Sequence, residues 1–153
     1  MARTDTASRV IAASLEEVYA AFIDSDALAT WLPPAGMTAE FERFDARPGG
    51  SYRMVLTYID ASTARGKADA DSDIVEARFV RLVPDVRVVQ EVDFVSDEPQ
   101  YAGTMTMTWT VTGVEAGTRV EFRADNVPDG ISAEDHAAGM NSSLTNLAAY
   151  LKG

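Results

Sequence analysis

Between residues 37 and 126 the chain alternates apolar and polar residues for most of its length, and this pattern constrains the fold more than any other feature. In the clearest segment Met105, Met107, Trp109 and Val111 alternate with threonines. Apolar residues at every second position are typical of strands that bury one face. Turn residues separate the alternating segments, which predicts antiparallel strands joined in chain order. We expect strands at residues 8–12, 37–41, 52–58, 74–83, 88–94, 105–111 and 120–124.

Helical periodicity flanks this region on both sides. Ser14 and Glu17 fit a capping box, in which a hydroxyl and a carboxylate three residues later satisfy free amides at the start of a helix. A second short helix, with Trp31 on its apolar side, ends at Pro33-Pro34. The last helix starts near Ser132, and its apolar stripe consists of His136, Met140, Leu144, Leu147 and Leu151. Because strands and helices are segregated along the chain, we expect an α+β fold in which the last helix covers a curved sheet.

Composition and charge exclude several classes of function. The chain has 153 residues, and we expect residues 1–153 to form a single domain. The formal net charge of −11 argues against contact with nucleic acid and with anionic membrane surfaces. The absence of cysteine excludes disulfides, cysteine-ligated zinc and a thiol nucleophile. No signal-peptide or membrane-spanning stretch stands out, so we expect a cytoplasmic protein.

The segment DARPGGSYRM, residues 45–54, raises the question of a phosphate-binding loop. The common nucleotide loops open a helix and carry either Lys-Ser/Thr after the last glycine or three spaced glycines. Here a strand pattern follows Gly49-Gly50 instead. We interpret the two glycines as a hairpin corner, where glycine supplies a positive φ. No nucleotide or other cofactor is expected.

The acidic residues and the histidine could serve a metal site or catalysis only with suitable partners. Asp69, Asp71 and Asp73 alternate in a polar segment, but the glycine and the terminal glutamate of a calcium loop are missing. A solvated loop is the better interpretation. His136 is the only histidine, which excludes a histidine-rich metal site. Since the pattern shows no positioned partner for it, we expect His136 to cap or pack the last helix rather than to act as a base.

Several segments, taken in their order, resemble those of a known family. They are residues 14–22 (SLEEVYAAF), 31–34 (WLPP), 45–52 (DARPGGSY), 82–84 (LVP), 117–120 (GTRV) and 136–140 (HAAGM). Together they resemble the bacterial Hsp90-ATPase-activator-homologue proteins, the AHSA1-like branch of the SRPBCC superfamily. Members often carry tryptophan where Met140 stands and histidine near Ala124, so the chain departs from the family at these two positions.

The resemblance implies a Bet v 1-like, or START-like, helix-grip fold. In this fold a curved antiparallel sheet of six to seven strands wraps around a long C-terminal helix, two short helices follow the first strand, and a cavity lies between sheet and helix. Methionine and aromatic side chains line adaptable apolar pockets. We expect Trp31, Tyr52, Tyr58 and Trp109 to lie near the mouth of the cavity. The candidate ligand-binding residues are Trp31, Tyr52, Met54, Tyr58, Glu76, Arg78, Gln90, Phe94, Met107, Trp109, Phe122, His136, Met140 and Leu144.

The polar candidates would determine specificity. Gln90 shares the parity of its apolar neighbours and is expected to face the cavity. Glu76 and Arg78 would also face it if Val80 points inward, whereas they would face water if Phe79 points inward. The alternation fits both arrangements. If the two charges are buried, they must pair with each other or with a ligand.

Three functions remain open. The first is binding of a small, largely apolar molecule in the cavity, with no catalysis assigned. The second, implied by the family's name, is a protein-interaction module that acts with an Hsp90-type chaperone. The third is a polyketide cyclase-like or hydrolase-like enzyme, for which Glu76, Arg78 and Gln90 are the candidate acid–base residues. Both a monomer and a homodimer are compatible with the sequence.

Overall fold

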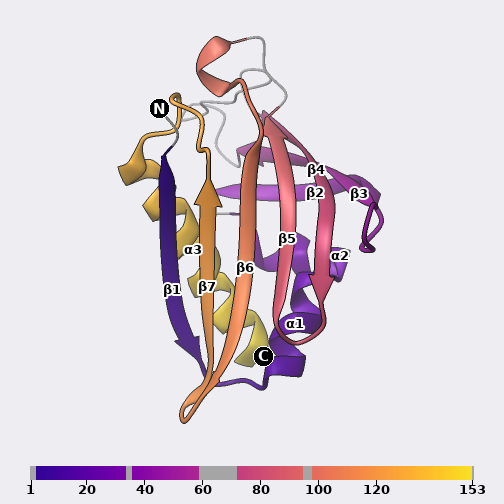
Figure 1. Ribbon diagram of the computed structural model, residues 1–153, viewed down its shortest axis with the longest axis vertical. Helices are drawn as coiled ribbons and strands as arrows, with labels where there is room; N and C mark the ends of the chain where they lie inside the picture. The colour runs from indigo at the N-terminus through magenta and orange to yellow at the C-terminus, as the bar shows by residue number, and fades with distance from the viewer. Residues whose placement is uncertain (1–2, 34–35, 59–71, 95–97, 153) are drawn as a thin grey trace.

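The structure, a computed structural model, describes residues 3–33, 36–58, 72–94 and 98–152. Within these residues seven strands form one antiparallel sheet in the order β1-β7-β6-β5-β4-β3-β2 (Figure 1). The elements are β1 (Thr4–Ile11), α1 (Leu15–Phe22), α2 (Ser25–Trp31), β2 (Met37–Phe44), β3 (Ser51–Tyr58), β4 (Ser72–Val83), β5 (Arg87–Phe94), a 3₁₀ turn η2 (Pro99–Tyr101), β6 (Met105–Val114), β7 (Gly117–Asp125) and α3 (Ala133–Lys152).

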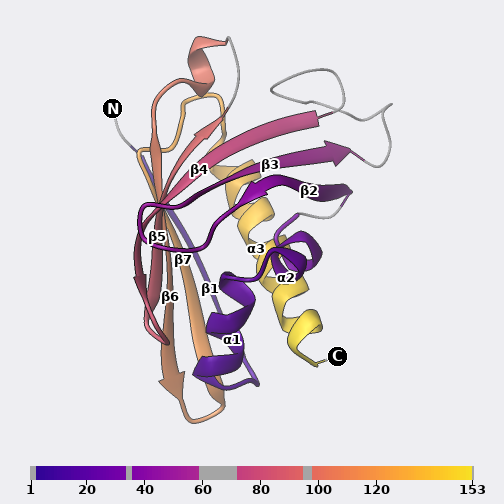
Figure 2. The same ribbon diagram turned by 90° about the vertical axis from the view of Figure 1, so that its right-hand side faces the viewer.

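The sheet curves around α3. Seen from the side, β2, β3 and β4 turn over one end of α3, whereas β1, β6 and β7 run along it (Figure 2). The pairing register shifts between Phe41 and Arg43 in β2 and between Phe79 and Arg81 in β4. Such bulges bend a strand and increase its twist, which helps the sheet to fold over the helix. The expected helix-grip α+β fold is confirmed.

Local side-chain contacts define the helix starts. The Ser14 hydroxyl accepts from the Glu17 amide at 3.1 Å, and the Glu17 carboxylate accepts from the Ser14 amide at 3.2 Å, so the capping box is present. Asp24 caps α2, and the Ser132 hydroxyl accepts from the Asp135 amide at 3.0 Å at the start of α3. The first strand was expected at residues 8–12, but β1 already begins at Thr4 because its whole length pairs with β7.

Hydrogen bonds join α3 to the end of α2. The Ser143 hydroxyl donates to the carbonyl of Leu32 at 2.6 Å, and the Asn146 amide donates to the carbonyl of Pro33 at 2.9 Å. These contacts satisfy carbonyls that the end of α2 leaves without helical partners. They also hold α3 against the segment that leads from α2 into the sheet.

Of the two orientations that the sequence allows for β4, the structure has the one in which the charged side chains face outward. Phe79 is buried, whereas Glu76 and Arg78 lie on the opposite face of the strand. The expectation of a polar loop reaching residue 73 is wrong at its end, since Asp73 belongs to β4 and is buried. Residues 59–71, including Asp69 and Asp71, lie outside the described residues.

Gly49 and Gly50 form the corner between β2 and β3, as expected. Gly49 has a φ of +82°, in the left-handed region that favours glycine. At Gly50 an added Cβ would lie 2.2 Å from the carbonyl oxygen of Asp45. The backbones of both glycines pair with Phe79 on β4: the Gly49 amide donates to its carbonyl and the Gly50 carbonyl accepts from its amide, each at 2.9 Å. A strand follows, so this corner is not a phosphate loop.

Alanine substitutions at these glycines should differ in cost. Gly50→Ala should lower the free energy of unfolding by about 2–3 kcal/mol, since the backbone must move to remove the clash. Gly49→Ala has open space around its Cβ and should cost only the left-handed φ, about 1 kcal/mol. Urea unfolding of both variants measures the difference. Equal losses would contradict the clash at Gly50.

Candidate ligand cavity

A cavity of about 330 Å³ lies between the concave face of the sheet and α3. Its walls come from β2 to β7, from α3 and from the segments before β2 and before α3. Most of the candidates named from the sequence line it: Tyr52, Met54, Tyr58, Gln90, Phe94, Met107, Trp109, Phe122, His136 and Met140. The lining residues outside the list of ligand-binding candidates are Leu32, Met37, Leu56, Asp73, Val75, Val92, Met105, Ile131, Asp135, Gly139 and Ser143.

The signals for these missed residues differ. Leu56, Val92 and Met105 share the strand parity of neighbouring candidates, so the alternation puts them on the same face. Ile131 lies in a connection without periodicity, and Gly139 carries no side chain, so no pattern pointed to either. They enter the lining only because α3 crosses the sheet at this position.

A hydrogen-bonded pair forms the polar part of the cavity wall. The Tyr52 hydroxyl donates to Oε1 of Gln90 at 2.6 Å. Burial raises the pKa of Tyr52 far above its ordinary value, so the phenol stays protonated and remains the donor. Because Oε1 is occupied in this way, the amide nitrogen of Gln90 must turn its two N–H groups elsewhere.

Two buried nitrogen donors in this wall have no acceptor among the described residues. Gln90 is 0% exposed and Trp109 is 2% exposed. Neither Gln90 Nε2 nor Trp109 Nε1 has a hydrogen-bond partner among the described residues. Buried donors without a partner are uncommon in folded proteins, and each costs about 1–3 kcal/mol. Since both side chains line the cavity, an oxygen atom inside it could satisfy them.

A second polar group lies where the start of α3 meets β1. Nδ1 of His136 lies 2.8 Å from Oδ2 of Asp5, and Arg3 contacts the same carboxylate at 3.0 Å. Arg3 also donates to the carbonyl of Ile131. Burial raises the pKa of the Asp5 carboxyl, but hydrogen bonds from Arg3 and His136 outweigh it and hold this pKa below its usual value. The expectation that His136 lacks a positioned partner is therefore wrong, because Asp5, 131 positions away in the chain, is that partner.

Two apolar candidates belong to the packed core and not to the cavity lining. Trp31 is 0% exposed and its indole N–H donates to the carbonyl of Ala21 at 2.9 Å, so it does not lie near the mouth. Its ring packs against Phe22, Trp109 and Phe122. Leu144 is buried one turn after Met140 and is absent from the lining. Both residues lie on the apolar side of their helix, as expected, but neighbouring elements pack over their side chains.

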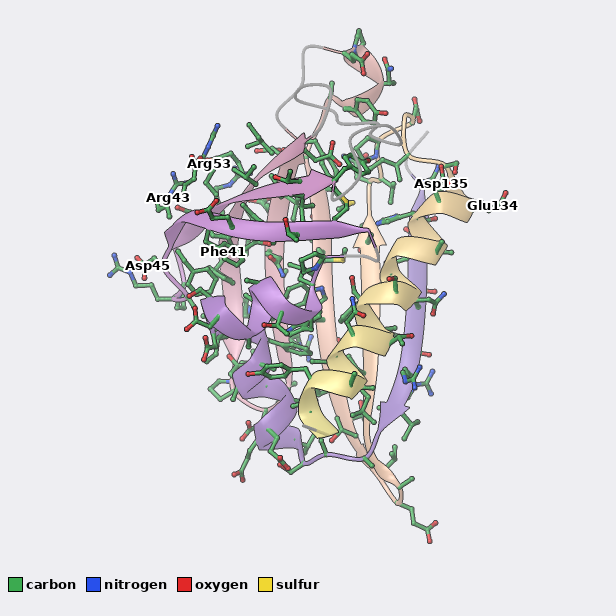
Figure 3. All side chains as sticks on the ribbon, turned by 180° about the vertical axis from the view of Figure 1, so that it is seen from behind. Phe41, Arg43, Asp45, Arg53, Glu134 and Asp135 are labelled. Carbon is green, nitrogen blue, oxygen red and sulfur yellow. The ribbon has the colours of Figure 1, made fainter. Side chains whose placement is uncertain are left out.

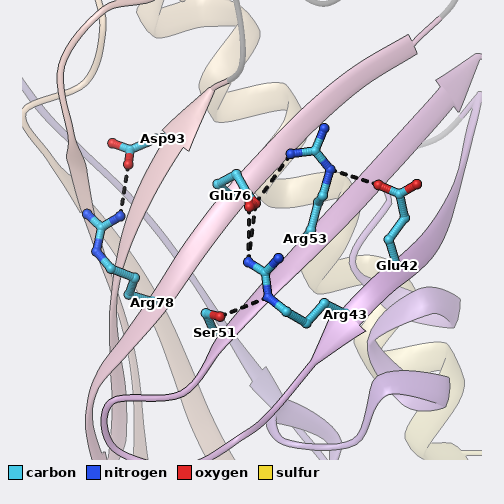
Figure 4. A network of polar contacts seen from close by, with 7 residues as sticks. All are labelled: Glu42, Arg43, Ser51, Arg53, Glu76, Arg78 and Asp93. Carbon is cyan, nitrogen blue, oxygen red and sulfur yellow. Dashed lines mark hydrogen bonds and ion pairs between the residues drawn. The ribbon is translucent and has the colours of Figure 1, made fainter.

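Glu76 and Arg78 are wrong as cavity residues, because they lie on the outer face of the sheet. Arg43 contacts Glu76 at 3.0 Å, Arg53 contacts it at 3.5 Å, and Arg78 contacts Asp93 at 3.0 Å (Figure 4). Arg43 and Arg53 project away from α3 (Figure 3). Ion pairs of this exposed kind contribute about 0–1 kcal/mol each. An enzyme that uses Glu76 and Arg78 as its acid–base pair in the cavity is excluded.

In residues 3–33, 36–58, 72–94 and 98–152, no group of three or more His, Asp or Glu side chains is placed to hold a metal ion. In the same ranges, no helix is long and apolar enough to cross a lipid bilayer.

Comparison with known proteins places this fold in a family. A protein from Chromobacterium violaceum superimposes with a TM-score of 0.85 at 30% identity, and the match covers 99% of each chain. A protein from Rhizobium loti has a TM-score of 0.74 at 28% identity, covering 99% of this chain and 98% of the other. The AHSA1 protein from Silicibacter pomeroyi has a TM-score of 0.79 at 19% identity over 98% of each chain, a likeness of fold.

The family model gives the assignment. No curated protein matches the chain. The model described as "Activator of Hsp90 ATPase homolog 1-like protein" matches residues 12–152, which is nearly the whole chain and includes the cavity-lining strands and α3. The protein therefore belongs to the Activator of Hsp90 ATPase homolog 1-like family, with the helix-grip fold that its sequence resembles.

Proposed function

We propose that the protein binds a small, largely apolar molecule that carries an oxygen acceptor, in the cavity between the sheet and α3. The observation that carries this proposal is the pair of buried, unpartnered donors at Gln90 and Trp109 in the cavity wall. A water molecule could satisfy them in the free protein, and a ligand carbonyl or ether oxygen could replace it. The ligand would then recover the hydrogen bonds that the folded chain leaves unmade.

The rest of the lining supports an apolar body for this ligand. Met54, Met105, Met107 and Met140 surround the space, together with the rings of Phe94 and other aromatic residues. Methionine has three rotatable bonds and a polarizable sulfur, so such a wall adapts to ligands of different shape. A volume of about 330 Å³ lies in the range of cavities that hold small organic molecules.

The family's description suggests an alternative function, an interaction with an Hsp90-type chaperone. It predicts that the purified protein raises the ATPase rate of an Hsp90-type chaperone and is retained by it in a pull-down. An unchanged ATPase rate at saturating concentrations of this protein would exclude that alternative. It would leave the cavity proposal untouched, since that proposal depends only on the residues of the cavity wall.

Native mass spectrometry of the freshly purified protein tests the binding proposal directly. We expect a species heavier than the 16.5 kDa chain, which loses the added mass on denaturation. Benzophenone, an apolar ketone, and diphenylmethane, the same body without the oxygen, serve as probes for protein stripped of ligand. Trp109 lies in the cavity wall, so quenching of tryptophan fluorescence reports binding. Failure of both probes to bind, with no co-purified molecule, would overturn the proposal.

The Gln90→Leu substitution should weaken ketone binding selectively. We expect the Kd of benzophenone to rise about 3–10-fold, the value of one hydrogen bond, while the Kd of diphenylmethane stays the same. Because the substitution also leaves the Tyr52 hydroxyl unpaired, the matched variant is Tyr52→Phe combined with Gln90→Leu. This double variant should be as stable as the native protein or more stable, since both partners are removed together. An equal loss of affinity for both probes would show that Gln90 supports only the shape of the wall.

A further inference from the structure

His136 presents a defined hydrogen-bonding group to the cavity. A carboxylate only accepts hydrogen bonds, so the contact of 2.8 Å with Asp5 requires the proton on Nδ1. In the neutral ring Nε2 then carries a lone pair and accepts. No hydrogen-bond partner of Nε2 lies among the described residues, while the side chain, 13% exposed, lines the cavity. Arg3 and Asp5 thus orient the ring from behind, and its accepting nitrogen remains available to a ligand.

The sheet register places Asp5, the partner of His136, in one row with Gln90. Asp5 pairs with Ala124, Ala124 with Met107, and Met107 with Gln90. Residues paired directly across antiparallel strands share a face, so these four lie in one row on the concave side. Three strand spacings separate the ends of the row, about 14 Å along the sheet. The polar groups therefore lie at opposite ends of this row, with His136 beside its Asp5 end and the donors of Gln90 at the other.

The charges near His136 determine which ligand group suits it. Asp135 and Asp73 also line the cavity, and Asp5 lies directly behind the ring. Arg3 is the cation that contacts this group, and its charge is already shared with Asp5. The carboxylate of Asp5 behind the ring and that of Asp135, the residue before His136, disfavour an anionic ligand group there. An uncharged hydroxyl can donate to Nε2 without this repulsion.

We propose that the cavity selects a two-ended ligand, an apolar body with an oxygen acceptor at the Gln90 and Trp109 end and an uncharged hydroxyl that donates to Nε2 of His136 at the other. This deepens the proposed function and rests on it. His136 contacts the ligand, whereas Asp5 is a positioning residue that acts through the ring. The structure thereby assigns a chemical class, hydroxyl-bearing carbonyl compounds of low charge.

The histidine tautomer gives the first test, and it needs no ligand. His136 is the only histidine, so a protein labelled with ¹⁵N-histidine shows one pair of ring nitrogens in long-range ¹H–¹⁵N spectra. We expect the neutral ring to be protonated at Nδ1. In the Asp5→Asn variant the carboxylate is gone, and both tautomers should be populated. A native ring protonated at Nε2 would overturn the inference, since it could not accept from a hydroxyl.

Matched probe pairs give the second test. Benzophenone is compared with 4-hydroxybenzophenone, and 4-acetylbiphenyl with 4-acetyl-4′-hydroxybiphenyl, so that the hydroxyl lies at a shorter and a longer distance from the carbonyl. We expect at least one phenol to bind about 3–10-fold tighter than its parent. In His136→Phe the gain should disappear, so that each phenol binds no more tightly than its parent ketone, and in Asp5→Asn the gain should shrink. The anionic 4-benzoylbenzoic acid should bind more weakly than benzophenone.

The outcomes separate this inference from the proposed function. If neither parent ketone binds the native protein, the proposed function fails and this inference fails with it. If the ketones bind but neither phenol gains affinity, or if the gain persists in His136→Phe, ligand binding stands and the assignment to His136 is wrong. If 4-benzoylbenzoic acid binds more tightly than benzophenone, the cavity takes anionic ligands and the hydroxyl class is wrong.

Discussion

The Trp31→Ala variant should lose about 3–5 kcal/mol of unfolding free energy, the largest stability change that we expect from a single substitution outside the backbone corners. Trp31 is 0% exposed, and its ring centroid lies 5.3 Å from that of Trp109 and 5.9 Å from those of Phe22 and Phe122. The substitution opens a void among these rings. It also removes the indole donor and leaves the Ala21 carbonyl without that partner. Urea unfolding followed by circular dichroism measures the loss.

The Trp31→Phe variant is the matched control. It keeps most of the apolar volume but not the indole N–H, so we expect it to lose about 1–3 kcal/mol. The difference in unfolding free energy between Trp31→Ala and Trp31→Phe measures the cost of the void. The loss that remains in Trp31→Phe measures the missing hydrogen bond and the change in shape. A loss below about 1 kcal/mol in Trp31→Ala would contradict the placement of this side chain in the core. It would restore the sequence-based expectation that Trp31 lies near the cavity mouth.

The Gly139→Phe variant should block the cavity with little change to the fold. Gly139 lines the cavity, and an added Cβ would meet no atom within 4 Å, so a large side chain at this position enters the space that the ligand would occupy. Forcing ligand and ring into one volume costs about 1–3 kcal/mol, which corresponds to about a 5–150-fold rise in the Kd of benzophenone. Quenching of tryptophan fluorescence measures the affinity.

The Gly139→Ala variant supplies the control for that experiment. A methyl group occupies little of the cavity, so the affinity for benzophenone should change by less than about threefold. The same substitution should stabilise α3 by up to about 1 kcal/mol, because glycine inside a helix has more conformational freedom to lose than alanine. If Gly139→Phe binds benzophenone as the native protein does, the probe binds elsewhere and the cavity is not the ligand site.

The two largest expected effects describe two parts of one interior. The cluster around Trp31 is fully packed and stabilises the fold, while the space beside Gly139 and Gln90 is left unfilled and contains unpaired donors. A protein that needed only a stable core would be more stable with both volumes filled, because cavities and unpaired buried donors each cost free energy. Retaining the second volume is consistent with a binding role.

Much of the architecture could be predicted from the sequence because it depends on local interactions. Alternation with a period of two marks strands, and a hydroxyl followed three residues later by a carboxylate marks the start of a helix. Hence Ser14 and Glu17 are where the capping box was expected, and Gly49-Gly50 form the expected hairpin corner. The order of these elements also carried the family resemblance.

The sequence by itself thus determined the elements, their order and the set of apolar side chains from which the cavity is built. The tertiary structure decided which of these side chains line it and what the polar groups contact. Alternation cannot tell which face of β4 is inward, because a shift of one residue turns Glu76 and Arg78 inward and Phe79 outward. In the sheet Phe79 pairs with Gln90 on β5, so the two share the inner face. The contact between Asp5 and His136 has no local signal either, since it joins the first strand to the last helix and forms only when the sheet closes around α3.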